Sequence, residues 1–188
     1  KGLAAAAKKA GRAASAGLIG LAVDGNAGAM VEINAETDFV ARNEIFQDVV
    51  GKIANVVLGI GSDVDTIKAA AYPDTGRTVD EEITHQIATI GENMLLRRAE
   101  SLSVENGILA SYLHGSLAPG LGKIGVLVAL ESTGDQGKLH EVGKQLAMHV
   151  AATKPLAVSR DDLDPAELER ERAVLSEQAR ESGKPEEI

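Results

Sequence analysis

The hydrophobic and polar positions at the start of the chain form two short apolar runs and then a stripe at helical spacing. The two runs, residues 17–23 and 29–34, are separated by a Gly, Asn and Asp cluster, and this pattern predicts a β-hairpin. The stripe then predicts a long helix that ends where glycines interrupt it, at residues 59–61. Its apolar face consists of Phe46, Val49, Val50, Ile53 and Val57. A shorter helix is expected from residues 62–63, which can cap it, to Ala71.

A second set of elements follows a turn at residues 73–76. Thr78 and Glu81 have the spacing of a capping box, and the helix that they begin presents one apolar face. That face consists of Ile83, Ile87, Ile90 and Met94. Runs separated by turn-forming Gly and Pro then predict three strands, at residues 97–103, 108–114 and 124–130. Two helices are expected last, at residues 136–153 and from Pro165 to Gly183.

The order of these elements predicts an α+β protein. We expect two related subdomains, each a small antiparallel sheet covered by helices. The first is placed at residues 17–95 and the second, with a helical extension, at residues 96–188. Residues 1–16 begin with an Ala-rich stretch that has no clear apolar stripe, and they are interpreted as a helix or a linker. Residue identity between the two halves is weak, so a true internal repeat stays open.

Composition limits the classes of partner. The net charge of −9 disfavours a nucleic-acid-binding surface, which needs a basic footprint. One basic cluster in the Ala-rich start is interpreted as a solvated helix or linker, with phosphate or RNA contact as the alternative; its members are Lys1, Lys8, Lys9 and Arg12. The chain has no Cys and no run of roughly 18 apolar residues, so we expect neither thiolate metal sites nor a membrane span. A cytoplasmic location fits these features.

The sequence lacks the motifs of catalysis and nucleotide binding. A phosphate-binding loop at Gly122 and Lys123 would need a Gly and a hydroxyl at positions 117 and 124. Those positions hold Leu117 and Ile124. No dinucleotide-binding glycine motif follows a strand, and the four His lack the spacing of a zinc motif. We therefore expect no catalytic residue, cofactor or metal site, and a function in surface recognition.

The predicted helix at residues 136–153 is one candidate for such a surface. Its core stripe is expected to consist of Leu139, Val142, Leu146 and Val150. Met148 points away from that stripe, and His149 lies at its edge. An exposed Met suits a partner surface because its side chain adapts to irregular shapes. The alternative is that Met148 packs under another helix of the same chain.

Phe39, one of the two Phe of the chain, is the other candidate. If a helix begins at Thr37 or Asp38, Phe39 lies seven residues before Phe46 on the core stripe and is buried, and periodicity alone favours this interpretation. If Asn43 is the helix cap instead, Phe39 protrudes beside Asp38. A ring next to a carboxylate at a helix start would then form a wedge, in which the ring supplies contact energy and the charge fixes orientation.

The stretch around Phe39 also carries a family resemblance. Residues 32–43, Glu-Ile-Asn-Ala-Glu-Thr-Asp-Phe-Val-Ala-Arg-Asn, resemble the signature of the bacterial elongation factor Ts family throughout their length. Members of that family are nucleotide-exchange factors for the GTPase elongation factor Tu. Further stretches with this resemblance cover almost all of the chain; they are residues 1–12, 90–93, 97–98, 111–115, 124–128, 147–152, 154–155 and 182–185.

The resemblance implies a partner and a mechanism. The chain is expected to bind elongation factor Tu with GDP bound, to disturb its magnesium and phosphate site, and to promote GDP release in translation elongation. The residues that this implies for the magnesium side are Thr37, Asp38, Phe39 and Val40. Asp38 and Phe39 would push between helices of the GTPase domain. Met148 and His149 would form a second contact, near the phosphate-binding loop of the GTPase.

Two parts of the family have no counterpart in this sequence, a small helical domain before residues 1–16 and a helical portion beyond Ile188. Lys1 is not a Met, and residues 183–188 read as a helix end and a new helix start, so we interpret the chain as part of a longer protein. The oligomeric state stays open, with a homodimer and a heterotetramer among the alternatives. The alternative functions are an interaction module without exchange activity and a small-molecule enzyme with its site between the subdomains.

Overall fold

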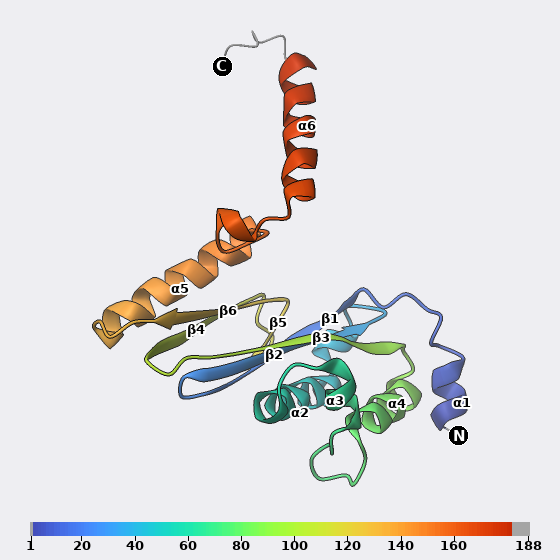
Figure 1. The fold of residues 1–188 in the computed structure, drawn as a ribbon. Helices are drawn as coiled ribbons and strands as arrows, with labels where there is room; N and C mark the ends of the chain where they lie inside the picture. Colours follow the sequence, from blue (N-terminus) through green and yellow to red (C-terminus); the bar gives the residue numbers. More distant parts are fainter. Residues whose placement is uncertain (1, 182–188) are drawn as a thin grey trace. The chain divides into compact units, whose positions relative to one another are not determined.

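A four-stranded antiparallel sheet with strand order β3-β2-β1-β5 lies at the centre of the fold (Figure 1). The computed structural model describes residues 2–181. The strands of this sheet are β1 (Ala16–Asp24), β2 (Ala27–Ala35), β3 (Met94–Ser103) and β5 (Leu121–Gly122). A separate antiparallel ribbon is formed by β4 (Gly107–His114) and β6 (Ile124–Glu131). Antiparallel sheets covered by helices confirm the predicted α+β class.

The helices also follow the sequence pattern closely. They are α1 (Gly2–Ala7), α2 (Glu44–Ile60), α3 (Val64–Ala69), α4 (Val79–Ile90), α5 (Gln136–Thr153) and α6 (Pro165–Glu181), with the short 3-10 turns η1 (Val40–Arg42) and η2 (Arg160–Asp162). The predicted capping box is confirmed, because Thr78 and Glu81 each accept a hydrogen bond from the backbone N–H of the other. The predicted helix end at Gly183, the stretch at residues 182–185 and Lys1 lie outside the described residues.

The core forms where α2 packs along β1 and β2. Phe46, Val50 and Ile53 of the predicted stripe are fully buried there. Gly20 of β1 allows the close approach of the helix, since a Cβ at this position would lie 2.8 Å from Val50 Cγ1 and 3.2 Å from Ala54 Cβ. Gly20 thus lets α2 pack closely on β1 at this point of a largely aliphatic core.

The structure corrects the expected grouping of the strands. The sequence pattern placed residues 97–103 with the two later strands, whereas β3 pairs with β2. The reason is burial, because Met94, Leu96 and Ala99 of β3 belong to the same apolar cluster as Phe46. The cluster therefore draws β3 onto the sheet that α2 covers.

The pairing of β2 with β3 contains a register shift between Glu32 and Ile33. Arg98 pairs with Glu32 and Leu96 pairs with Ile33, so Arg97 is an extra residue in β3, as in a β-bulge. Side chains of a regular strand alternate between its two faces. With the extra residue, Leu96 and Ala99 both face the buried side although they are three positions apart.

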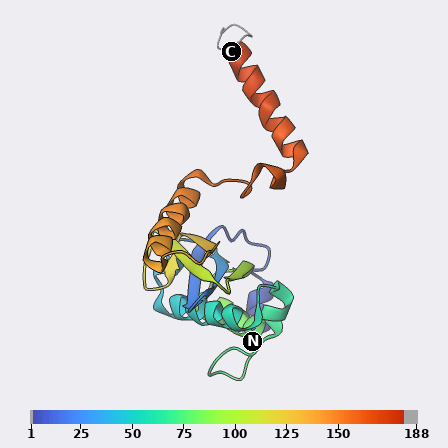
Figure 2. The same ribbon diagram turned by 60° about the vertical axis from the view of Figure 1, so that its left-hand side comes forward.

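The β4–β6 ribbon covers the other face of the sheet, and α5 covers the ribbon (Figures 1 and 2). Leu109 of β4 packs against Gly28 of β2, where a Cβ would lie 2.2 Å from Leu109 Cδ2. The neighbouring residues Ile108 and Ala110 pack instead against Gly143 of α5. The order of layers is therefore α2, sheet, ribbon and α5.

The chain divides into two compact units, Lys1–Ala152 and Thr153–Ile188. Within the second unit, the described part holds η2 and α6, and α6 has no buried residue. The predicted division into residues 1–16, 17–95 and 96–188 stays a prediction. No helix within residues 2–181 combines the length and the apolar character needed to cross a membrane.

Candidate functional site

A sharp corner connects the end of β2 to the start of α2. We define it as residues 36–43. β2 ends at Ala35, η1 spans Val40–Arg42, and α2 begins only after Asn43. The Asn43 side chain accepts hydrogen bonds from the backbone N–H groups of Ile45 and Phe46, at 2.9 and 3.4 Å. Asn43 is therefore the helix cap, and the chain before it is free to leave the helix axis.

This geometry exposes Phe39, whose side chain is 81% accessible. The burial that periodicity favoured is wrong because the helix does not extend back to Thr37 or Asp38. Val40 and Ala41 fill the core beneath the corner instead, with 5% and 0% exposure. Asp38 is exposed beside Phe39. The corner thus presents a ring next to a carboxylate, as the alternative interpretation required.

The four residues predicted for the first partner contact have different environments. Asp38 and Phe39 face solvent, Thr37 is half-buried, and Val40 is buried. Val40 therefore anchors the corner in the core, and Asp38 and Phe39 are the members that a partner can reach in this conformation. A contact of Val40 with a partner stays a prediction.

Both ends of the corner are fastened by hydrogen bonds. At its start, Glu92 accepts bonds from the backbone N–H of Thr37 at 2.9 Å and from the Thr37 hydroxyl at 2.6 Å. At its end, Gln47 Nε2 of α2 donates to the Ala41 carbonyl at 2.8 Å. Asp38 and Phe39 therefore project from a backbone that is held at Thr37 before them and at Ala41 after them.

Sequence reasoning missed Glu36 and Glu92. Glu36 accepts a hydrogen bond from the backbone N–H of Asn93 at 2.6 Å, and Arg12 Nη1 lies 3.5 Å from the same carboxylate oxygen. Asn93 Nδ2 donates to the Arg12 carbonyl at 2.8 Å. The available signal was weak, because Glu36 and Glu92 stood out only as members of the stretches at residues 32–43 and 90–93 that resemble the family, with no indication that the two stretches meet.

The second predicted contact lies on α5, in a different part of the fold. Met148 is 46% exposed and His149 is exposed, so both side chains are accessible. The expected core stripe of this helix is wrong in part, because Val142 and Leu146 are exposed. The buried positions are the small residues Gly143 and Ala147. They pack on the ribbon because small side chains let the helix come closest to it: a Cβ at Gly143 would lie 2.7 Å from Ala110 Cβ.

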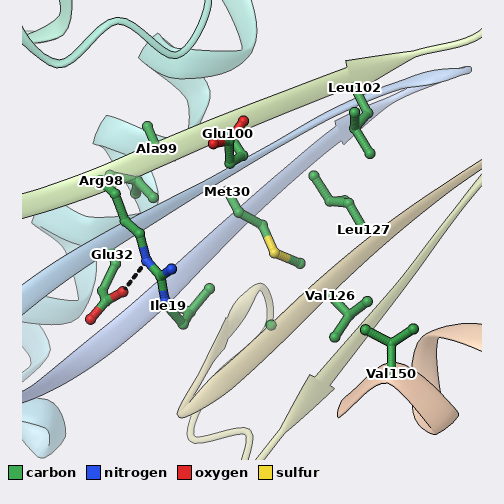
Figure 3. Close-up of a pocket in the computed structure, with 12 residues that line it drawn as sticks. Ile19, Met30, Glu32, Arg98, Ala99, Glu100, Leu102, Val126, Leu127 and Val150 are labelled. Atoms are coloured by element: carbon green, nitrogen blue, oxygen red, sulfur yellow. Dashed lines mark hydrogen bonds and ion pairs between the residues drawn. The ribbon is translucent and has the colours of Figure 1, made fainter. Parts of the chain in front are cut away.

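A groove between the central sheet and β6 is the place where an enzyme site would have been expected (Figure 3). Its volume of about 360 Å³ would hold a small molecule. Apolar side chains such as Met30, Leu127 and Val150 make up most of its lining. Arg98 Nε donates to Glu32 at 2.6 Å, as Figure 3 shows, so this pair of charges is satisfied within the groove.

The groove has few polar side chains. Its lining holds Arg98 and two carboxylates, Glu32 and Glu100, and no Ser, His or Lys. In the part of the chain that the structure describes, no three His, Asp or Glu side chains are grouped to hold a metal ion.

The family model and the similar curated proteins identify the same family. Residues 36–188 match the family described as Elongation factor TS. The whole chain is 62% identical over 188 residues to elongation factor Ts of Rhodospirillum centenum and 59% identical over 189 residues to that of Rhodospirillum rubrum, and it covers 61% of each relative. It is 60% identical over 188 residues to elongation factor Ts of Gluconobacter oxydans, of which it covers 62%. The chain thus spans about three fifths of the length of these curated relatives.

Proposed function

Since the chain belongs to the elongation factor Ts family, we propose that it is the core of a guanine nucleotide exchange factor for elongation factor Tu. In this proposal it binds the GTPase with GDP bound and promotes GDP release during translation elongation in the cytoplasm. The observation that carries the proposal is Phe39, an aromatic side chain that is 81% exposed next to Asp38 on a corner fastened at both ends.

The proposed mechanism requires no covalent chemistry. Magnesium in such GTPases bridges the nucleotide phosphates and protein oxygens, so displacement of the ion weakens GDP binding. An exchange factor has to bind the nucleotide-free state more tightly than the GDP state. By thermodynamic reciprocity, bound GDP then weakens the binding of the factor by the same ratio.

Each exposed side chain of the corner has a distinct role in the proposal. Phe39 inserts between helices of the GTPase domain and provides apolar contact area. Full burial of such a ring contributes about 1.5–3 kcal/mol, which corresponds to about ten- to hundredfold in an equilibrium constant. Asp38 places a negative charge beside the ring, which fixes its orientation and disturbs the magnesium site.

Met148 and His149 of α5 provide the second contact in this proposal, near the phosphate-binding loop of the GTPase. Both side chains are exposed on one helix. The thioether of Met148 can adapt to an irregular partner surface. Two separate contacts allow the factor to act on the magnesium side and the phosphate side of the nucleotide together.

Release of fluorescently labelled GDP from elongation factor Tu tests the proposal directly. We expect micromolar amounts of this chain to accelerate release, and Phe39→Ala to reduce that acceleration about tenfold or more. Val23→Ala is the matched control, because Val23 is an exposed apolar residue near the β1–β2 turn. Binding without accelerated release would instead support the interaction module. No acceleration by the wild-type chain would refute the exchange function.

A further inference from the structure

Two carboxylates hold the start of the corner in a reciprocal arrangement. Glu92, which follows α4, accepts from the backbone N–H and the hydroxyl of Thr37. Glu36, at the start of the corner, accepts from the backbone N–H of Asn93. Each of the two segments, residues 36–37 and 92–93, thus supplies one carboxylate and one backbone N–H. We call this arrangement the crossed hydrogen bonds.

We propose that Glu92 is a positioning residue for nucleotide exchange, which acts through Thr37 to hold Asp38 and Phe39 in the orientation that the GTPase receives. The inference rests on the proposed exchange function and adds to it a residue outside the set proposed to contact the partner. The crossed hydrogen bonds join segments that are 55–57 residues apart in sequence. They therefore fix the corner relative to the end of α4.

The exposure of Phe39 makes this support important. A buried ring is held by its neighbours, whereas the Phe39 ring, at 81% exposure, depends on its backbone for direction. The backbone N–H of Thr37, two residues before Phe39, is held directly by Glu92. Hydrogen bonds to an ionised carboxylate are about twice as strong as neutral ones, so a single side chain is able to order this turn. An ordered corner binds with less loss of conformational entropy.

The chemistry of the two contacts provides a conservative variant. The side-chain oxygen of a Gln at position 92 can accept from the Thr37 N–H, while its amide nitrogen can donate to the Thr37 hydroxyl oxygen. Glu92→Gln therefore keeps both contacts, and Glu92→Ala removes both. Glu100→Ala is the control for removal of a carboxylate, because Glu100 is exposed on β3.

The first test needs no partner. Amide hydrogen exchange of the free chain reports on local opening of the corner. We expect Glu92→Ala to accelerate exchange at the Thr37 amide about tenfold, while amides in the middle of α2 stay unchanged. Glu100→Ala should leave the Thr37 amide near its wild-type rate, and Glu92→Gln should fall between the wild type and Glu92→Ala because its bonds are neutral. An unchanged Thr37 amide in Glu92→Ala would overturn the inference.

The second test is a double-mutant cycle in the GDP-release assay. We expect Glu92→Ala to reduce the acceleration of release about fivefold to tenfold, and Glu92→Gln to restore most of it. If Glu92 acts through the corner, Glu92→Ala should have little further effect in the Phe39→Ala background. If the two substitutions reduce the acceleration of GDP release independently, so that their effects multiply in the double variant, Glu92 does not act by positioning Phe39. The same conclusion follows if Glu92→Gln is as impaired as Glu92→Ala.

The two tests separate failure of this inference from failure of the proposed function. If the wild-type chain does not accelerate GDP release, the exchange function fails, and the role of Glu92 in exchange fails with it. Hydrogen exchange still decides in that case whether Glu92 orders the corner. If the wild-type chain accelerates release and Glu92→Ala acts as the wild type does, the positioning role alone is refuted.

Discussion

Phe39 and Phe46, the two Phe of this chain, are seven residues apart and have opposite environments. Phe46, in the first turn of α2, is fully buried, and Phe39 is 81% exposed at the corner before that helix. Seven residues are close to two helical turns, so a continuous helix would have placed both rings on one face. The cap at Asn43 interrupts the helix and separates a core ring from a surface ring.

Substitution of Phe46 should affect stability. We expect Phe46→Ala to lower the free energy of unfolding by about 3–5 kcal/mol, because it removes a buried ring and leaves a cavity. Phe39→Ala should change that free energy by less than about 0.5 kcal/mol, because its ring faces solvent. Urea unfolding followed by circular dichroism measures both values. Equal destabilisation by the two variants would contradict the difference in environment.

Met148 offers a second prediction on partner binding. We expect Met148→Ala to reduce the acceleration of GDP release about fivefold, since about half of its side chain is available to a partner. Val142→Ala is the matched control on the same helix, with 48% exposure against 46% for Met148. Both variants should unfold at the same urea concentration as the wild type. A larger loss of exchange activity in Val142→Ala than in Met148→Ala would indicate that the second contact lies on another face of α5.

Gly143 should tolerate no side chain. The added methyl group of Gly143→Ala would lie 2.7 Å from Ala110 Cβ and 2.9 Å from Ile108 Cδ1, so we expect a loss of about 1–3 kcal/mol in the free energy of unfolding. Gly51→Ala in α2 is the control, because a Cβ there has no heavy atom within 4 Å. That control should gain about 0.5–1 kcal/mol from helix propensity. Urea unfolding should show a lower free energy of unfolding for Gly143→Ala and a higher one for Gly51→Ala.

Tyr72 should make stability fall at alkaline pH. Burial raises the pKa of Tyr72, and the nearby carboxylates of Asp48 and Glu82 raise it further. The unfolded chain therefore loses this proton first, and stability declines as the pH rises above about 10 by up to about 1.4 kcal/mol per pH unit. Below that pH the contribution is fully present.

The comparison of wild type with Tyr72→Phe isolates this contribution. We expect the variant to gain stability relative to the wild type between about pH 10 and about pH 11, with a constant difference at lower pH. The hydrogen bond of Lys52 with Asp48 raises the pKa of Lys52 and so also removes stability at alkaline pH. It can form in both proteins, so its contribution largely cancels in the comparison, although Lys52 Nζ lies 5.8 Å from the centre of the Tyr72 ring. Parallel pH profiles would contradict the assignment to Tyr72.

Patterns confined to neighbouring residues predicted much of this fold. The hairpin of β1 and β2, the stripe of α2 and the capping box of α4 depend on spacing within one element, and each is confirmed. Pairing between distant elements was not predictable in the same way. The position of β3 beside β2 depends on a shared apolar cluster, and the pairing of β5 with β1 involves two residues of each strand.

The candidate site shows the same division between local and distant information. The family resemblance pointed to Asp38 and Phe39 as a partner contact, which stays a prediction. Periodicity favoured a helix start at Thr37 or Asp38, which is wrong because α2 begins after Asn43. The bonds that hold the corner come in part from Glu92, 55 residues further along the chain. For α5, apolar periodicity pointed to Val142 and Leu146, whereas the closest packing uses Gly143 and Ala147 because they have the smallest side chains.

Arg97, the extra residue of β3, has a consequence for how this sequence can vary. Its side chain is exposed, so the backbone accepts many other residues at this position. The presence of a residue at this position, in contrast, is required for the side chains on both sides of it to face the core. Deletion of one residue here would shift the alternation of one half of β3, so that either Leu96 or Ala99 would turn out of the core. At this point the fold depends on the number of residues in the strand more than on their identity.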